Sequence, residues 1–508
     1  MQAHMRRKWQ VTPDVKLTLG LRLDIPFFGD TGYQNAQADA LSFRDEDGNT
    51  VKYETKKLPD PNVLWSPRLG FNWDVMGDRS TQVRGGTGIF TGRPAYVWIS
   101  NQIGNTGVLT GFERVTNTTA RPFHPDPNHY KQVPTGGPAG RYELALTDPD
   151  FRFPQLWRTN VAIDQKLPYD LVGTAEFLYS KDVNGIYYIN ANLKDPNSAF
   201  VGVDNRPRWT NTADSTVRIN QNVDNAIVLK NQNEGYSWNL AFSLELPYSE
   251  GLFAKAAYSY GESKNTVDPG SIAFGSWNNN QHPGNPNKPG LGFSSNSPGH
   301  RIFATASYRR EYFDLGATTV TLFWESRTQG NASYTFSNDM NNDGGRSNDL
   351  IYIAKDPSEM NFQQYTSSGI TYTVQQQVDA WEAFIKQDKY LSANRGKYAE
   401  RGAAFLPMIS RVDLSILQDV FAEFLGKRNT LQLRLDFLNV ANMINKYHGV
   451  GKRFVTTQPL ESRGVDAQGK ALYRLRAINN QLPTKSFEPT ADITDVYRIQ
   501  FTIRYIFN

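Results

Sequence analysis

The chain of 508 residues contains no cysteine. A disulfide framework, a thiolate metal site and a cysteine nucleophile are therefore all excluded. The chain also lacks any run of about 18 apolar residues, the length that a membrane-spanning helix needs. Its mean hydropathy of −0.55 argues further against a helical membrane protein. The net charge of +4 is weak for this length and gives no reason to expect a nucleic-acid partner.

Catalytic motifs are missing as well. No HExxH, GxSxG or P-loop pattern occurs in the sequence. The glycine-rich stretch 86–92 lies in an alternating segment with no helix after it, so it does not resemble a phosphate-binding loop. The six histidines are scattered, at His4, His124, His129, His282, His300 and His448. We therefore expect no enzymatic activity.

The first residues do not have the pattern of a signal peptide. Arg6, Arg7 and Lys8 are basic, but no apolar segment follows them. Either the chain is cytosolic, or a destination in the cell envelope requires a start that is missing from this sequence.

The final stretch, Asp495–Asn508, alternates without a break. Period-two alternation puts successive side chains on opposite faces of a strand. One face carries only apolar and aromatic residues, namely Tyr497, Ile499, Phe501, Ile503, Tyr505 and Phe507. The other face carries Arg498, Gln500, Thr502 and Arg504. This pattern fits a soluble sheet with one buried face, and it fits the closing strand of an outer-membrane barrel equally well.

The rest of the chain favours the barrel. About thirteen alternating segments recur, and short turns alternate with polar loops of roughly 35 to 80 residues. The two kinds of connection must lie at opposite ends of an antiparallel sheet, as in bacterial outer-membrane barrels with short periplasmic turns and long extracellular loops. A soluble barrel needs an apolar interior, whereas these strands are charged on one face. The sequence therefore predicts an all-β antiparallel transmembrane barrel in the outer membrane of a Gram-negative cell.

The strand count also suggests an incomplete barrel. Thirteen strands would be the tenth to the twenty-second of a 22-strand barrel, although an extra or missed strand pair would fit equally well. The closing strand would then lack its natural partner and would either pair with the Arg7–Val11 strand or remain unpaired. We expect a gaping barrel.

Several stretches resemble TonB-dependent receptors, specifically their Oar-like branch. The hairpin 9–24 is similar to a mid-barrel hairpin of that family, and the segments 66–75, 84–107, 339–353, 390–419 and 431–449 are similar to the Oar-like branch. The terminal RYIFN resembles the aromatic end of the family, except that Asn508 follows the aromatic residue.

The resemblance implies a receptor with a signal peptide, a TonB box, a plug and 22 strands. On this interpretation residues 1–508 are the C-terminal part of the barrel and contain no plug domain. The implied partners are outer-membrane lipid, the barrel assembly machinery, an unknown extracellular ligand, and TonB only through the missing N-terminal part. The resemblance also implies uptake, or export, of a ligand by the intact protein. A structural or adhesive surface barrel without transport activity is the alternative.

Two loop segments carry candidate sites. Asp339, Asn341, Asp343 and Asp349 space oxygen ligands around a glycine turn, as a Ca²⁺ loop does, although the twelfth position is Leu350 rather than glutamate. Asx-turns would explain the same residues without an ion. Near the top of a strand, Arg93, Tyr96, Trp98, Asn101 and Gln102 could line a ligand vestibule, or could serve only for loop packing.

Overall fold

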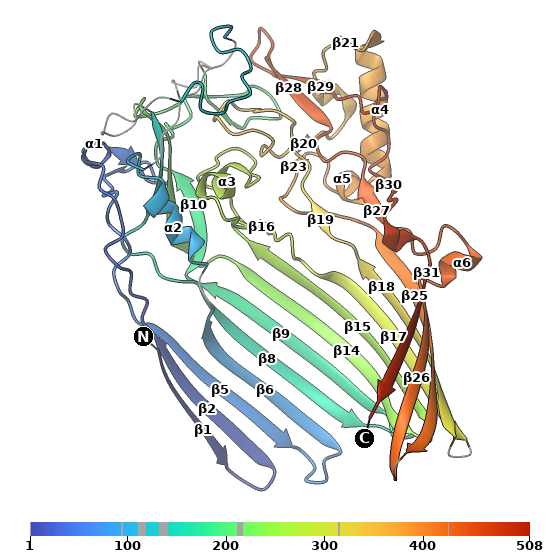
Figure 1. Ribbon diagram of the computed structural model, residues 1–508. Coiled ribbons are helices and arrows are strands. Elements are labelled where there is room, and N and C mark those ends of the chain that lie inside the picture. The colour runs from blue at the N-terminus through green and yellow to red at the C-terminus, as the bar shows by residue number, and fades with distance from the viewer. Residues whose placement is uncertain are drawn as a thin grey trace.

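The computed structural model describes residues 2–92, 95–109, 118–131, 141–210, 217–312, 315–424 and 426–507. Its largest element is one antiparallel sheet, here called the wall (Figure 1). Thirteen of its strands follow each other in one order, and the short strand β16 (Gly292–Phe293) pairs with β15. The thirteen are β1 (Gln2–Gln10), β2 (Val15–Asp24), β5 (Leu64–Asp74), β6 (Thr81–Thr91), β8 (Gln155–Lys166), β9 (Val172–Val183), β14 (Tyr236–Ser249), β15 (Leu252–Asn265), β17 (Gly299–Tyr312), β18 (Gly316–Thr328), β25 (Met408–Phe424), β26 (Lys427–Leu438) and β31 (Arg498–Ile506).

The connections alternate as expected. Short turns join the strands at one end of the wall, and all the long connections leave from the other end (Figure 1). The prediction of an all-β antiparallel fold is confirmed, and thirteen wall strands match the expected number. β1 and β31 lie at the two ends of the strand order, and no ladder joins them in the described part of the chain. The wall is therefore an open sheet.

The two faces of the wall differ in chemistry. The six apolar residues predicted for the closing strand are between 47% and 79% exposed. In the ladder between β26 and β31, Ile503 lies opposite Leu433 and Phe501 opposite Leu435. On the other face, a hollow of about 550 Å³ is lined by Arg434, Gln500, Thr502 and other mainly polar residues. An exposed apolar band backed by a polar interior is the arrangement of a lipid-facing barrel wall.

The long connections fold together at one end of the wall and are here called the cap. A three-stranded sheet in the order β10–β13–β7 forms one part of the cap, and β13 and β7 are parallel. Its strands are β7 (Tyr142–Thr147), β10 (Gly185–Asn190) and β13 (Val223–Gln232). The main helices are α2 (Val97–Gly104), α3 (Ala273–Asn278), α4 (Val374–Gln387) and α5 (Lys389–Ala393). The described residues contain no helix that is both long enough and apolar enough to cross a membrane.

Short elements complete the cap. They are α1 (Ala36–Asp39), β3 (Phe43–Arg44), β4 (Thr50–Val51), β11 (Ser198–Ala199), β12 (Pro207–Arg208), β19 (Asn331–Ala332), β20 (Tyr352–Ile353), η1 (Pro357–Glu359), β21 (Tyr365–Ser367), β22 (Ile370–Tyr372), β23 (Lys397–Tyr398), β24 (Ala404–Phe405), α6 (Ala441–Ile444), β27 (Lys452–Phe454), β28 (Leu460–Val465), β29 (Ala471–Leu475), β30 (Phe487–Pro489) and η2 (Ile493–Asp495).

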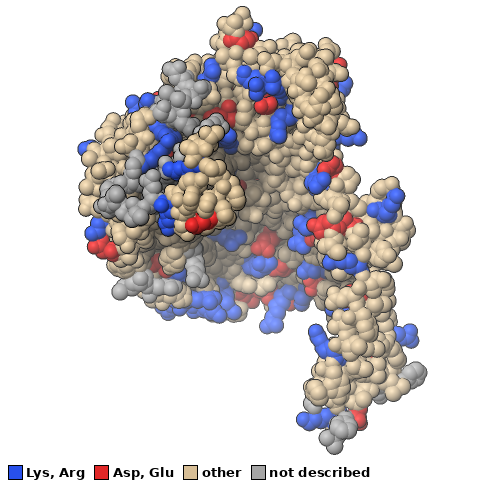
Figure 2. Space-filling view, turned by 45° about the horizontal axis from the view of Figure 1, so that its top comes forward, with Lys and Arg blue, Asp and Glu red and all other residues tan. Residues whose placement is uncertain are grey.

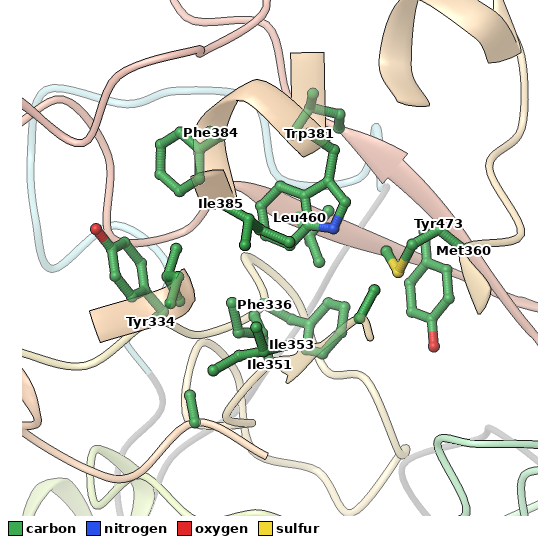
Figure 3. Close-up of a cluster of buried hydrophobic side chains, with 14 of the residues drawn as sticks. Tyr334, Phe336, Ile351, Ile353, Met360, Trp381, Phe384, Ile385, Leu460 and Tyr473 are labelled. Carbon is green, nitrogen blue, oxygen red and sulfur yellow. The ribbon is translucent and has the colours of Figure 1, made fainter. Parts of the chain in front are cut away.

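The packed apolar core of the protein lies in the cap. Figure 3 shows its largest cluster. There, side chains of α4 pack against other residues of the same β18–β25 connection and against residues of the β26–β31 connection. Trp381 and Phe384 are almost fully buried there, beside Leu460. The helix begins at Val374 because Thr373 and Gln376 form a capping box. The cap therefore has an interior of its own, built from described residues of the long connections.

Candidate functional site

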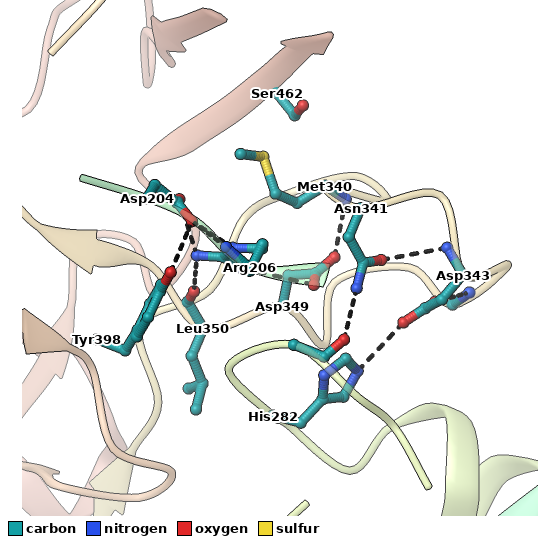
Figure 4. A network of polar contacts seen from close by, with 12 residues as sticks. Asp204, Arg206, His282, Met340, Asn341, Asp343, Asp349, Leu350, Tyr398 and Ser462 are labelled. Atoms are coloured by element: carbon teal, nitrogen blue, oxygen red, sulfur yellow. Dashed lines mark hydrogen bonds and ion pairs between the residues drawn. The ribbon is translucent and has the colours of Figure 1, made fainter. Parts of the chain in front are cut away.

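A buried polar cluster lies in the cap where three long connections meet (Figure 4). His282 comes from the connection between β15 and β17, and Asp343 and Asp349 come from the connection between β18 and β25. Arg206 comes from the connection between β9 and β14. All four are at most 2% exposed. The cluster therefore joins segments that are far apart in the sequence.

The segment 339–349 coils so that its carboxylates accept backbone hydrogen bonds. Asp343 Oδ1 accepts from Gly345 N at 2.7 Å, and Asp349 Oδ2 accepts from Met340 N at 2.8 Å. The second oxygen of each carboxylate, Asp343 Oδ2 and Asp349 Oδ1, is buried and has no hydrogen-bond partner among the described residues. Each carboxylate thus has one oxygen held by the backbone and one that points into the cluster.

His282 is fixed from its backbone. Its N–H donates to Asn348 O, and its carbonyl accepts from Leu350 N, both at 2.9 Å. Its side chain is 0% exposed, and neither ring nitrogen has a hydrogen-bond partner in the described part of the chain. Nε2 lies 3.4 Å from Asp343 Oδ2. One ligand atom from each of His282, Asp343 and Asp349 can be chosen so that all lie within 4.8 Å of one another.

The surroundings shift the protonation of these groups. Burial raises the pKa of Asp349 to about 6. Burial and two neighbouring carboxylates hold the pKa of Asp343 well above its usual value. Burial raises the pKa of Asp339 to about 7 as well. Burial, helped by the Arg206 guanidinium, lowers the pKa of His282 to about 3, so that its imidazole is neutral.

Arg206 supplies the positive charge of the cluster. Its guanidinium donates to both oxygens of Asp204, at 2.9 and 3.1 Å, and to Leu350 O at 2.8 Å. Its NH1 lies 3.6 Å from Asp349 Oδ1. Tyr398 donates its hydroxyl to Asp204 Oδ1 at 3.0 Å. One guanidinium therefore faces two carboxylates, whereas Asp343 lies beside the neutral imidazole of His282.

The structure places the predicted Ca²⁺-loop residues in three different situations. Asp343 and Asp349 come together, joined by His282. Asp339 is next to them, and its Oδ2 accepts from Gly344 N at 3.0 Å. The amide of Asn341 makes structural contacts, because its nitrogen donates to Gly284 O and its oxygen accepts from Asp343 N. His282 was missed in the sequence, since no local pattern connects it with residues 339–349.

The predicted vestibule residues lie in and beside α2, a helix that the alternation pattern did not reveal. Asn101 donates to Ser271 O and the Trp98 indole donates to Gly270 O, both in the connection that leads to α3. Gln102 is buried and donates to two carbonyls of residues 55 and 57. Tyr96 remains 63% exposed. Arg93 lies outside the described residues.

A larger polar cavity opens beside the cluster. It has a volume of about 600 Å³ and lies among the connections β15–β17, β18–β25 and β26–β31. Its lining includes Asp268, Ser271, Gln281, Arg401 and Gln458. Figure 2, which looks partly down onto the cap, shows a hollow with acidic and basic side chains in and below it. A cavity of this size and chemistry can hold a small polar ligand.

One comparison with known protein families matches most of the chain. A family model described as an outer membrane beta barrel domain matches residues 2–449. No curated protein matches the chain significantly.

Among solved structures, the siderophore receptor PirA from Acinetobacter baumannii is 11% identical with a TM-score of 0.40, and the similarity covers 87% of this chain and 41% of that one. The outer membrane transporter YddB from Escherichia coli is 11% identical with a TM-score of 0.38, covering 93% of this chain and 52% of that one. The FrpB iron transporter from Neisseria meningitidis is 10% identical with a TM-score of 0.39, covering 87% and 41%. The chain thus spans about half or less of the length of these structures.

Proposed function

The chain belongs to the outer membrane beta-barrel family, and on that premise we propose that it supplies barrel wall and ligand-binding cap to a TonB-dependent receptor of the Oar-like type. The location in the outer membrane follows from the family. Receptor function and the Oar-like branch rest on the resemblance of the segments 66–75, 84–107 and 390–419 to that branch. In the intact receptor, ligand bound at the cap would be taken up, or exported, at the expense of energy delivered by TonB.

The observation that carries the proposal is the cavity of about 600 Å³ in the cap. Three connections build it, and each is anchored in the wall by the strands on either side. Arg401 is held there by hydrogen bonds to the carbonyl and side chain of Asn265, at the end of β15. Because rigid neighbours fix its polar lining, the cavity is suited to selective binding of a ligand rather than to passive diffusion.

Other partners would act at other parts of the molecule. We expect a plug to face the polar inner side of the wall, near Arg434 and Gln500, and TonB to act through that plug rather than through the residues of this chain. The apolar face of β31 would contact lipid, and we expect the barrel assembly machinery to recognise this last strand.

Blocking the cavity tests the proposal. Ser271 is exposed and lines the cavity, so Ser271→Trp should fill it without removing a buried contact. The purified chain in detergent is titrated with ferric desferrioxamine B, maltoheptaose and a random hexapeptide mixture, and its melting temperature is followed by tryptophan fluorescence. We expect at least one probe to raise the melting temperature of the unmodified chain saturably, and Ser271→Trp to abolish that rise.

Ser367→Trp is the matched control, since Ser367 is exposed on the β21–β22 hairpin and lies away from the cavity lining. It should bind the probe as the unmodified chain does. If no probe shifts the melting temperature, while cells that carry the protein adhere to a surface better than cells that lack it, the adhesive alternative replaces the receptor proposal.

A further inference from the structure

We propose that His282, Asp343 and Asp349 bind a first-row transition-metal dication such as Zn²⁺, and that this ion fastens two of the cap connections together. The proposal concerns the stability of the cap and does not depend on what the receptor binds. It starts from three ligand atoms that can lie within 4.8 Å of one another. It also starts from the His282 imidazole, which is fully buried, lacks a hydrogen-bond partner among the described residues and points at Asp343 (Figure 4).

The distances fit a small tetrahedral ion. Two ligand atoms that are each about 2.05 Å from a tetrahedral zinc ion lie about 3.3 Å apart. His282 Nε2 and Asp343 Oδ2 are separated by 3.4 Å. This separation is too long for a good hydrogen bond, but it is the edge that a zinc ion would span. A carboxylate oxygen of Asp349 lies within 4.8 Å of a ligand atom of each of the other two residues, and it would move inward to complete the coordination.

The donor types favour a transition metal over Ca²⁺. Calcium is bound by six to eight oxygen atoms. This cluster offers an imidazole nitrogen and four buried side-chain oxygens without a hydrogen-bond partner among the described residues, one each from Asp339, Asp343, Asn348 and Asp349. The Asn341 amide, which a calcium loop would use, is occupied by Gly284 O and Asp343 N. Neutral imidazole with carboxylate is a usual ligand set for zinc. Asn348, which precedes Asp349, also has a buried amide without a hydrogen-bond partner in the described part of the chain.

The charge balance of the cluster supports an added cation. Four carboxylates, those of Asp204, Asp339, Asp343 and Asp349, lie in or beside the cluster, and Arg206 pairs with two of them, Asp204 and Asp349. With all four carboxylates ionised, the buried group would carry a net charge of −3, and burying uncompensated charge is costly. A dication reduces this to −1.

The position of the site explains what the ion would do. His282 directly follows Gln281, which lines the cavity of about 600 Å³, and Ser347 from the other connection lines it too. Asp343 and Gly344 also line a second cavity of about 380 Å³. An ion at this point would hold the two cap segments that separate the cavities in one arrangement, as structural zinc sites do.

Metal binding to the complete chain in detergent tests the proposal. The protein is treated with a chelator, freed of it, and titrated with Zn²⁺ and separately with Ca²⁺ in a calorimeter, and its metal content is measured by mass spectrometry. We expect one Zn²⁺ per chain and no heat from Ca²⁺. Co²⁺ in place of Zn²⁺ should give the visible absorption of a tetrahedral site. Loss of one ligand in His282→Gln or Asp343→Asn should weaken Zn²⁺ binding about 100-fold or more.

Asp343→Asn also distinguishes a metal-binding cluster from a buried polar network that binds no metal. Asparagine has nearly the same shape and carries no charge, so in a metal-free cluster it would leave the melting temperature unchanged or raise it. In the metal site, addition of Zn²⁺ should raise the melting temperature of the unmodified chain but not that of Asp343→Asn. The control is His124→Gln with His129→Gln, which removes the exposed, stacked histidine pair and should leave tight binding of one Zn²⁺ intact. Absence of Zn²⁺ binding, binding of Ca²⁺ instead, or equal Zn²⁺ affinity in Asp343→Asn would each overturn the proposal.

Discussion

At the scale of single residues, Arg206 is a buried cation whose ion pairs contribute to the stability of the cap. It is 0% exposed, pairs with Asp204 and Asp349, and its guanidinium carbon lies 5.0 Å from the centre of the Tyr398 ring. Arg206→Met keeps much of the apolar contact but leaves two buried carboxylates without their cation. Removing one partner of a buried ion pair costs about 3–5 kcal/mol. We expect a loss of this size in the free energy of unfolding, measured by urea titration with tryptophan fluorescence.

The matched control is the exposed pair of Lys288 and Asp47, in which Nζ and Oδ1 are 2.9 Å apart but both side chains are more than half exposed. Lys288→Met should change the free energy of unfolding by less than about 1 kcal/mol, because solvent screens such pairs. Equal effects of the two substitutions would mean that burial of Arg206 does not govern its contribution.

His282 and Asn341 show how far residues of the site can be predicted from sequence. The spacing of Asp343 and Asp349 around Gly344 is local, and in the structure both carboxylates lie in the cluster with His282. Asn341 has the same spacing, yet its amide turns to Gly284 O. His282 comes from another connection and carries no periodic signal. Contacts between distant connections depend on how the whole cap packs, and no local pattern records that packing.

At the scale of elements, α4 is the helix around which one side of the cap is organised. Phe384 is 0% exposed. Its ring stacks on that of Trp381, with the ring centroids 5.6 Å apart, and makes an edge contact with Tyr334, with the ring centroids 5.8 Å apart. Phe384→Ala should lower the free energy of unfolding of the cap by about 3–5 kcal/mol, the usual cost of removing a buried aromatic ring. Lys386 is two residues further along the same helix and is exposed, so Lys386→Ala should have little effect on the free energy of unfolding.

Calorimetry follows the unfolding of the cap in Phe384→Ala, and gel mobility reports whether the wall remains folded. The cap transition should move to lower temperature in Phe384→Ala, while the wall should keep the heat-dependent gel shift of a folded barrel, because α4 has its contacts in the cap. A wall that loses its gel shift together with the cap would show that the two parts unfold as one unit.

Elements of the wall were more predictable than elements of the cap. Alternation reported every wall strand because each one has a lipid face and a polar face, and a period of two is visible within a single segment. A period of two does not locate helices, and α4 begins at Val374 because Thr373 provides its N-terminal cap. The alternation pattern did not reveal α2, β7 or β10, because their buried sides pack against residues of other connections. The end of β15 also depends on a residue pair that is remote in sequence, since Lys264 and Asn265 pair with Phe293 and Gly292 of β16.

At the scale of the whole molecule, the wall has lipid on one side and a polar hollow on the other, and one strand can test this. Thr502 and Ile503 are neighbours near the middle of β31, at the same depth and on opposite faces. Arginine on the lipid face at mid-membrane costs about 2–4 kcal/mol, whereas an arginine on the inner face remains hydrated. Ile503→Arg should therefore be less stable than Thr502→Arg by about that amount, measured by urea titration of the chain folded into lipid vesicles. Equal stabilities would contradict the assignment of the two faces. They would mean that the aromatic row of β31 does not contact lipid, and that this edge of the open sheet is covered by other protein in the membrane.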